Sequence, residues 1–327
     1  MGLRGAGIRA EGGRIELVRR EHAWVGTFDA MASPCEVHVA GADLATAAHV
    51  ARAVAAEAWR IERKFSRYRS DNVVARINGA QGAIVRVDDE TARLLTYAAK
   101  LHELSEGRFD VTSGVLRKVW RFDGSDRVPS AAAVREVLAR VGWDRVRFEP
   151  PELTLEPGME IDFGGIGKEY AVDSAARLVK PLWPHCLINF GGDLCAVDAA
   201  AGGAPWIVGI ERPDEARVGG PRIERPDEAD GVGQRIETDA VARRIELGIG
   251  ALATSGDSRR FLLRDGKRYG HVLDARTGWP VEGAPRSVTV AAPTCTEAGM
   301  LATFALLHGA EAEAFLGAQG VRYWCRR

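Results

Sequence analysis

The stretch ALATSGDSRRFLLRDGKRYGHVLDARTGWP, residues 251–280, combines turn residues with two short apolar runs. The runs at 260–264 and 269–273 flank Asp265 and Gly266, which predicts a β-hairpin with a tight tip. Such a hairpin carries His271 and the turn at Asp274 to one end of a sheet, where loops held by rigid strands often carry chemistry. An ordinary surface hairpin with no catalytic role fits the same residues.

The composition is that of a globular protein without an obvious charged partner. The 327 residues are 46% hydrophobic, and 44 Lys and Arg balance 45 Asp and Glu. We therefore expect no nucleic-acid partner, and no apolar run approaches the roughly 20 residues of a membrane-spanning helix. The N-terminus lacks the apolar core of a signal peptide, so a cytoplasmic location is expected. Five scattered cysteines indicate free thiols in a reducing compartment.

The order of elements predicts a flexible leader over residues 1–22 and one domain over 23–327. Helices are predicted over 43–64, 89–104 and 130–140, because capping residues precede apolar residues at helical spacing. Strands are predicted within 24–39 and as a short pair at 146–150 and 152–157. The sequence IERPDEA occurs at Ile210 and again at Ile223. Such charged, Pro-punctuated units indicate a surface loop insertion at about 211–245.

A glycine-rich turn occurs in EIDFGGIGKEYAVDSAARLV, residues 160–179. A short strand ending in Asp162 is expected to lead through Gly164 and Gly165 into an amphipathic helix. Glycines let the backbone approach a ligand, and a helix N-terminus offers free N–H groups to an anion such as a diphosphate. Lys168 adds a positive charge in the first turn. The spacing is neither GxGxxG nor a P-loop, and a purely structural tight turn is the alternative.

Seven blocks in order give the sequence a resemblance to the FAD:protein FMN transferases, the ApbE-like proteins, from about Trp24 to the C-terminus. They are FSRYRSDNVVARIN (65–78), EGRFDVTSG (106–114), IDFGGIGKEYAVD (161–173), INFGGDL (188–194), TSGDSRRF (254–261), YGHVLDARTGWPV (269–281) and SVTVAAPTCTEAGMLAT (287–303).

The resemblance implies a magnesium-dependent transfer of FMN from FAD to a threonine hydroxyl of a target flavoprotein, with release of AMP. It also implies an α+β, or mixed α/β, fold with two lobes, mixed sheets, flanking helices and an FAD cleft between the lobes. The positions that match FAD contacts of the family are Met31, Tyr68, Arg108, Phe109, Asp110, Asp162, Lys168 and His271. The positions that match its Mg²⁺ ligands are the backbone carbonyls of Gly165 and Ala302 and the side chain of Thr303.

One position departs from the family pattern. The family's helix motif reads roughly EADALAT, whereas residues 297–303 read EAGMLAT, so Gly299 stands where the family has its metal-binding Asp. Glu297 is no simple substitute, because two residues back along a helix points about 200° away. Asp257 and Asp274, both on loops, are the nearby candidates. A cation that is also bound by a diphosphate can tolerate such a loss, since Mg²⁺ often relies on substrate phosphates and water.

The expected mechanism relies on positioning and charge neutralisation, as phosphoryl-type transfers do. Asp257 or Asp274 would orient or deprotonate the acceptor threonine, and His271 would contact FAD or the leaving AMP. Asp274 has an alternative as a turn-capping carboxylate. Two other functions stay open: an FAD-binding protein that has lost turnover, and an FAD diphosphatase that gives FMN and AMP. A dehydrogenase is disfavoured, because no GxGxxG fingerprint with a following acidic residue occurs.

Overall fold

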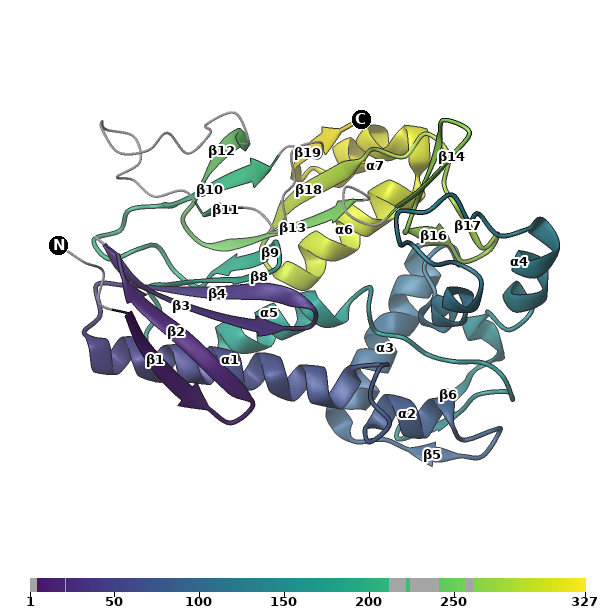
Figure 1. Cartoon of the computed structure of the whole chain (residues 1–327), viewed down its shortest axis with the longest axis horizontal. Coiled ribbons are helices and arrows are strands. Elements are labelled where there is room, and N and C mark those ends of the chain that lie inside the picture. The colour runs from purple at the N-terminus through teal and green to yellow at the C-terminus, as the bar shows by residue number, and fades with distance from the viewer. Residues whose placement is uncertain (1–4, 21, 212–221, 224–240, 257–260) are drawn as a thin grey trace.

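A large antiparallel sheet forms the centre of the molecule in the computed structural model (Figure 1), which describes residues 5–20, 22–211, 222–223, 241–256 and 261–327. Its nine strands lie in the order β1-β2-β3-β4-β8-β9-β13-β18-β19. Every pairing in this order is antiparallel. The strands are β1 (Gly5–Ala10), β2 (Gly13–Arg19), β3 (Ala23–Ala30), β4 (Ser33–Ala40), β8 (Cys186–Phe190), β9 (Asp193–Ala196), β13 (Gly250–Gly256), β18 (Ser287–Ala292) and β19 (Arg322–Arg326).

The flexible leader expected over residues 1–22 is wrong for its described part. β1 and β2 form a hairpin that joins the main sheet through β3. Ile15 and Leu17 point from alternate positions of β2 into the core and are fully buried. At the hairpin turn, a Cβ built on Gly12 would lie 2.6 Å from the Trp59 ring, so the turn packs closely on a helix. Burial of these side chains is what holds the segment in place.

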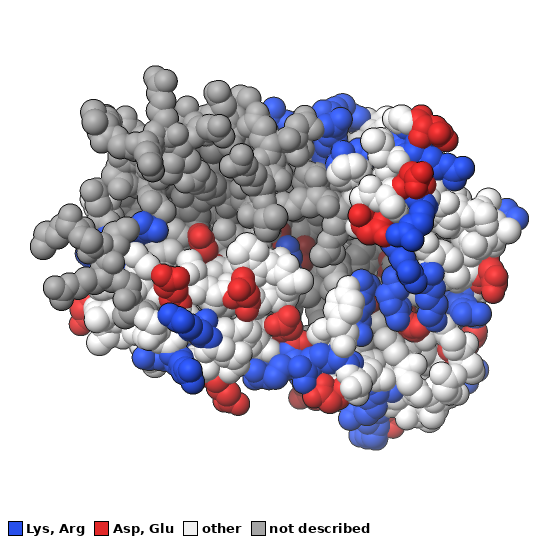
Figure 2. Space-filling view, in the orientation of Figure 1, with Lys and Arg blue, Asp and Glu red and all other residues white. Residues whose placement is uncertain are grey.

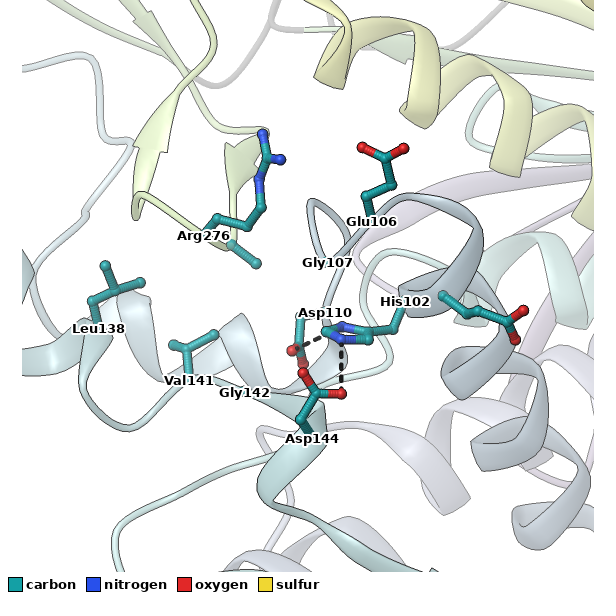
Figure 3. Close-up of a pocket in the computed structure, with 11 residues that line it drawn as sticks. His102, Glu106, Gly107, Asp110, Leu138, Val141, Gly142, Asp144 and Arg276 are labelled. Carbon is teal, nitrogen blue, oxygen red and sulfur yellow. Dashed lines mark ion pairs between the residues drawn. The ribbon is translucent and has the colours of Figure 1, made fainter.

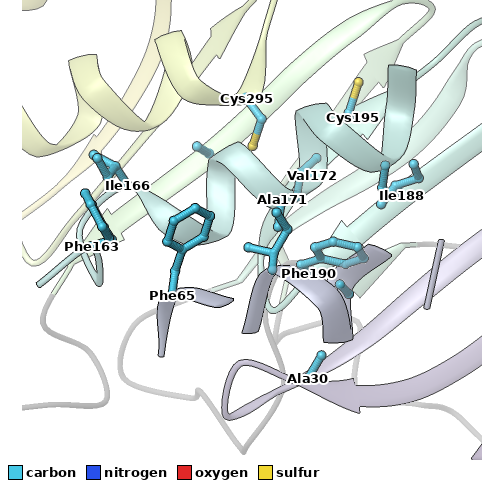
Figure 4. Packing of buried hydrophobic residues seen from close by; sticks show 14 of the residues in the cluster. Ala30, Phe65, Phe163, Ile166, Ala171, Val172, Ile188, Phe190, Cys195 and Cys295 are labelled. Carbon is cyan, nitrogen blue, oxygen red and sulfur yellow. The ribbon is translucent and has the colours of Figure 1, made fainter. Parts of the chain in front are cut away.

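Three helices cover one face of the sheet: α1 (Leu44–Phe65), α5 (Gly167–Val179) and α6 (Cys295–Leu307). α1 begins where Asp43 accepts the N–H of Thr46, and its alanine-rich stripe is buried, as the capping pattern predicted. α5 packs against both α1 and α6. The core between helices and sheet contains Phe65, Phe163 and Phe190 (Figure 4).

A small sheet lies on the other face, formed by β10 (Trp206–Glu211), β11 (Arg222–Ile223) and β12 (Val241–Leu247). Trp206 and Val208 pack there against Leu187 and Leu252 of the main sheet. The charged insertion expected at about 211–245 therefore begins and ends in strands. Residues 212–221 and 224–240 lie outside the described residues.

A separate apolar cluster surrounds Trp120 and Leu262. The predicted hairpin is confirmed as β14 (Phe261–Arg264) and β15 (Lys267–Gly270), with Asp265 and Gly266 at its tip. The remaining elements are β16 (Leu273–Asp274), β17 (Trp279–Pro280), η1 (Val111–Lys118), α4 (Ala131–Leu138), η2 (Trp143–Arg145), α2 (Val73–Asn78), α3 (Asp89–Leu104), β5 (Val85–Arg86), β6 (Arg147–Glu149), β7 (Glu152–Thr154), η5 (Gly309–Glu311) and α7 (Ala312–Gln319).

The α+β class is confirmed, while two details differ from expectation. The pairings between described strands are antiparallel throughout, where mixed sheets were expected. Residues 160–162, expected to be a strand, have no regular structure. Within the described ranges, no helix is both long and apolar enough to cross a membrane. Basic and acidic side chains are interspersed over the described part of the face in Figure 2.

Candidate functional site

An exposed glycine turn leads into the N-terminus of α5 and lies against an aromatic ring. Ile166 is its capping residue and contributes no side-chain hydrogen bond to the helix. Gly164 and Gly165 before it are exposed. A Cβ on Gly165 would lie 3.1 Å from the ring of Phe109, so the glycine allows the loop and the ring to meet. The N–H groups of Ile166 and Gly167 donate to the carbonyl of Phe163. The first turn of a helix has further N–H groups without intrahelical partners, and such groups can bind an anion.

Asp162 is held beside this turn by an arginine that sequence reasoning missed. Its carboxylate is paired with Arg67 and accepts the N–H of Gly164 at 2.9 Å. It therefore stabilises the glycine turn rather than the first turn of α5. The Arg67 guanidinium also donates to the hydroxyl of Tyr68 at 2.8 Å, and Tyr68 is 79% exposed. An exposed aromatic ring beside a fixed charge pair can stack on a flat ligand.

Lys168 lies between α5 and the bend that joins β8 to β9. Its Nζ is 2.9 Å from a carboxylate oxygen of Asp193. Burial disfavours the charged lysine, but the Asp193 and Glu169 carboxylates outweigh it and raise the pKa of Lys168. Lys168 therefore stays protonated at neutral pH and can attract a phosphate.

The β3–β4 turn meets the same bend. Met31 and Ala32 both have positive φ, 52° and 55°, which non-glycine residues rarely adopt. A Cβ on Gly191 would lie 2.6 Å from Ser33 and 3.7 Å from the Lys168 Nζ. The predicted positions Met31 and Lys168 are thus on segments that adjoin one another.

Helix α6 presents Gly299, Ala302 and Thr303 on one face, since they are separated by three and four residues. The Thr303 hydroxyl lies 3.0 Å from that of Ser255, which is near the end of β13. A Cβ on Gly299 would lie 2.6 Å from Cγ and 2.7 Å from Oε1 of Glu169 in α5. The space of a side chain at position 299 is therefore filled by the carboxylate of Glu169.

Glu169 is only 9% exposed. Burial, and next the negative charge of Asp193, raise the pKa of its carboxyl group, while Lys168 opposes that change. Sequence reasoning missed this residue. The signal was its phase on α5, because Glu169 lies three residues before Val172, on the buried stripe of the helix.

Arg108 and Asp110 are both engaged within the protein. Arg108 donates to the carbonyl of Leu307 at the end of α6 at 2.8 Å. Asp110 is buried, accepts the N–H groups of Thr112 and Trp143 at 2.7 Å, and lies 3.2 Å from Nδ1 of His102. Their assignment as FAD contacts stays a prediction.

His102 and Asp110 line a cavity of about 600 Å³ between α3, α4 and the turn at Arg276 (Figure 3). His102 also lies 3.5 Å from Asp144. The neighbouring Asp110 carboxylate raises the pKa of His102 above its ordinary value. The cavity lining includes Asp110 and neither Lys168 nor Thr303, so it is separate from the cluster at α5 and α6.

The three predicted catalytic residues have different surroundings. Asp257 lies outside the described residues. Asp274 is buried, and its carboxylate accepts the Arg276 N–H at 2.9 Å and pairs with the Arg276 guanidinium at 2.8 Å, as a turn-capping carboxylate would. His271 follows β15, with its ring centroid 6.3 Å from that of Phe122.

A cation at this site would need mainly oxygen donors. In the described part of the chain, no group of three or more His, Cys, Asp or Glu side chains is placed to hold a metal ion. The Thr303 hydroxyl, backbone carbonyls and one buried carboxylate at the Gly299 position are hard oxygen ligands that suit Mg²⁺ completed by phosphates and water.

Comparison with known proteins agrees with the resemblance. The ApbE family model matches residues 31–324. FAD:protein FMN transferases of Salmonella typhimurium and Haemophilus influenzae are 29% and 28% identical over 274 and 259 residues, covering 80% and 74% of this chain and 72% and 68% of theirs. The crystal structure of the ApbE protein from Thermotoga maritima superposes with a TM-score of 0.77 at 29% identity, covering 93% of this chain and 94% of that one. The chain therefore belongs to the ApbE family.

Proposed function

We propose that this chain is an FAD:protein FMN transferase that moves FMN from FAD to a threonine hydroxyl of a target flavoprotein and releases AMP. The names of the relatives support the reaction. The observation that carries the proposal is the charged lysine in the first turn of α5, directly after an exposed glycine turn. Positive charge and a helix N-terminus after glycines are features that favour binding of a diphosphate.

Transfer of FMN breaks the diphosphate, so the enzyme must position it and neutralise its oxygens. Lys168 and the free N–H groups of α5 would hold these oxygens. The exposed ring of Tyr68 would stack on a flat part of FAD. Asp162 would act through the loop, because its hydrogen bond to Gly164 fixes the turn that faces the phosphates.

Mg²⁺ would be held by the carbonyl groups of Gly165 and Ala302 and by the hydroxyl of Thr303, whose face of α6 is shared with Gly299. When bound, it would neutralise charge that develops on the phosphate oxygens. The hydrogen bond between Thr303 and Ser255 fixes the position of that hydroxyl.

The acceptor threonine needs a base within hydrogen-bond reach. Of the two aspartates considered, Asp274 is occupied by Arg276 and its own turn. We therefore propose Asp257, which follows the end of β13 in sequence, as the residue that orients or deprotonates the acceptor. His271 is proposed to contact FAD or the leaving AMP.

The test incubates the full chain with FAD, Mg²⁺ and a purified flavoprotein domain, and follows covalent flavin on the domain by gel fluorescence and mass spectrometry, and AMP by chromatography. The expected result is one FMN per domain with equal AMP, lost with EDTA and with a Thr→Val acceptor. AMP without protein-bound flavin would mean a diphosphatase. FAD binding with neither product would leave a flavin-binding protein.

A further inference from the structure

The Glu169 carboxylate lies in the space of the side chain that Gly299 lacks. The Cβ position of Gly299 is 2.6–3.0 Å from three atoms of Glu169, closer than real Cβ contacts. Glycine at 299 is therefore required by the present position of Glu169. The two residues belong to different helices, α5 and α6, that pack against each other.

The other buried carboxylates nearby have partners. Asp173 accepts the N–H groups of Cys295 and Thr296 at 2.8 and 2.9 Å. Asp193 pairs with the Lys168 Nζ at 2.9 Å. Glu169 is also buried, and its own backbone N–H is a hydrogen-bond donor to its carboxylate. A buried carboxylate is costly unless it is compensated.

We propose that Glu169 supplies the negative charge for the divalent cation of this site, in place of a carboxylate on α6 at position 299. The inference rests on the proposed function for the presence of that cation. Position 299 is one helical turn from Ala302 and Thr303, so a carboxylate in its space lies on the face of α6 that carries the oxygen donors. The carboxylate has moved from one helix to its neighbour while keeping its place in the site.

Two other carboxylates, Asp274 and Glu297, are placed differently. Asp274 is engaged by Arg276, and Glu297 follows the capping Thr294 in the first turn of α6, two residues before Gly299. The three heavy atoms nearest to the Cβ position of Gly299 all belong to Glu169. Loss of the carboxylate at 299 is therefore compensated within the chain by a carboxyl group that occupies the same space.

The test titrates Mn²⁺ into the full chain in the presence of saturating FAD and measures free Mn²⁺ by electron paramagnetic resonance. Glu169→Gln, which keeps the shape and removes the charge, is expected to weaken Mn²⁺ binding at least about tenfold. The matched control is Glu297→Gln, the same change on the adjacent helix, with an expected effect below about twofold. Equal affinities of the two variants would overturn the proposal.

A double variant tests whether Glu169 is a metal ligand or only a residue that packs against α6. Glu169→Ala combined with Gly299→Asp puts the charge back on α6 and removes the clash, so Mn²⁺ affinity is expected to recover to within about threefold of the original chain. Failure to recover, in a variant whose thermal unfolding matches that of the original chain, would show that Glu169 is not a ligand. If Mn²⁺ binding follows these expectations but no FMN is transferred, the proposed function fails and this inference stands.

Discussion

Asp173 of α5 binds the N-terminus of α6 through Thr296: its Oδ2 accepts the backbone N–H at 2.9 Å and also the side-chain hydroxyl. Its other oxygen accepts the N–H of Cys295. A negative charge at a helix N-terminus is favourable, and here it joins two helices. Glu169 lies one turn before Asp173 in α5, and Gly299 lies three residues after Thr296 in α6. The contact between Asp173 and Thr296 therefore also places Glu169 next to Gly299.

We expect Asp173→Asn to lower the free energy of unfolding by roughly 1–3 kcal/mol, because an amide leaves buried donors with a poorer acceptor. Urea unfolding at neutral pH measures this change in the free energy of unfolding. The control is Asp43→Asn, the same change at the exposed cap of α1, where Asn is as good a cap and the effect should stay below about 0.5 kcal/mol. An equal effect at both positions would contradict a special role for the contact between the helices.

The contact between Gly299 and Glu169 predicts strong thermodynamic coupling. Gly299→Ala should destabilise the chain by about 1–3 kcal/mol through overpacking. In a Glu169→Ala background the same change should be neutral or stabilise by up to about 1 kcal/mol, since Ala favours helix. Gly317→Ala in α7 is the control, because no described heavy atom outside its own helix backbone and neighbours lies within 4 Å of its Cβ position. If Gly299→Ala cost the same in both backgrounds, the contact would be refuted.

Local signals predicted much of this structure. Asp43, Asp88 and Ser130 each begin a helix where their side chains accept backbone N–H groups, and the 261–270 hairpin follows from its Asp-Gly tip. Such features depend on residues a few positions apart, so a single sequence contains them.

Contacts distant in sequence were missed. The first strands were mistaken for a leader because their short alternation around Ile15 is stabilised only by the rest of the sheet. Arg67 meets Asp162 across 95 residues, and Glu169 meets Gly299 across two helices. The sequence shows Gly299 where the family has an Asp. That Glu169 fills the space of the missing side chain follows only from the packing of α5 against α6.

Tyr68 is expected to act in binding and not in folding. Tyr68→Ala should weaken FAD binding at least about fivefold through lost stacking. Because the side chain is 79% exposed, the free energy of unfolding should change by less than about 0.5 kcal/mol. Tyr68→Phe keeps the ring and should bind FAD within about threefold of the original chain. Calorimetric titration of FAD measures all three proteins, and unchanged affinity of Tyr68→Ala would exclude Tyr68 from the site.

Acid stability should depend on Glu90, which joins α1, α3 and α5. Its carboxylate accepts from Arg60 and Lys64, both at 2.7 Å, and from the Tyr170 hydroxyl at 2.8 Å. The hydrogen bond from Arg60, and then that from Lys64, lower the pKa of Glu90 to about 2, against the opposing effect of burial. A carboxyl group with a lowered folded-state pKa contributes stability above its unfolded pKa and loses it as the pH falls through the folded value. Glu90 therefore contributes fully above about pH 4.5 and progressively less between about pH 4.5 and 2.

Glu90→Gln should be less stable than the original chain at pH 7, and the difference should shrink as urea unfolding is repeated at pH 5, 4 and 3. The exposed pair of Lys100 and Glu103 supplies the control, since Glu103→Gln should change stability little at any of these pH values. A difference for Glu90→Gln that stayed constant from pH 7 to pH 3 would show that its effect comes from packing and not from its charge.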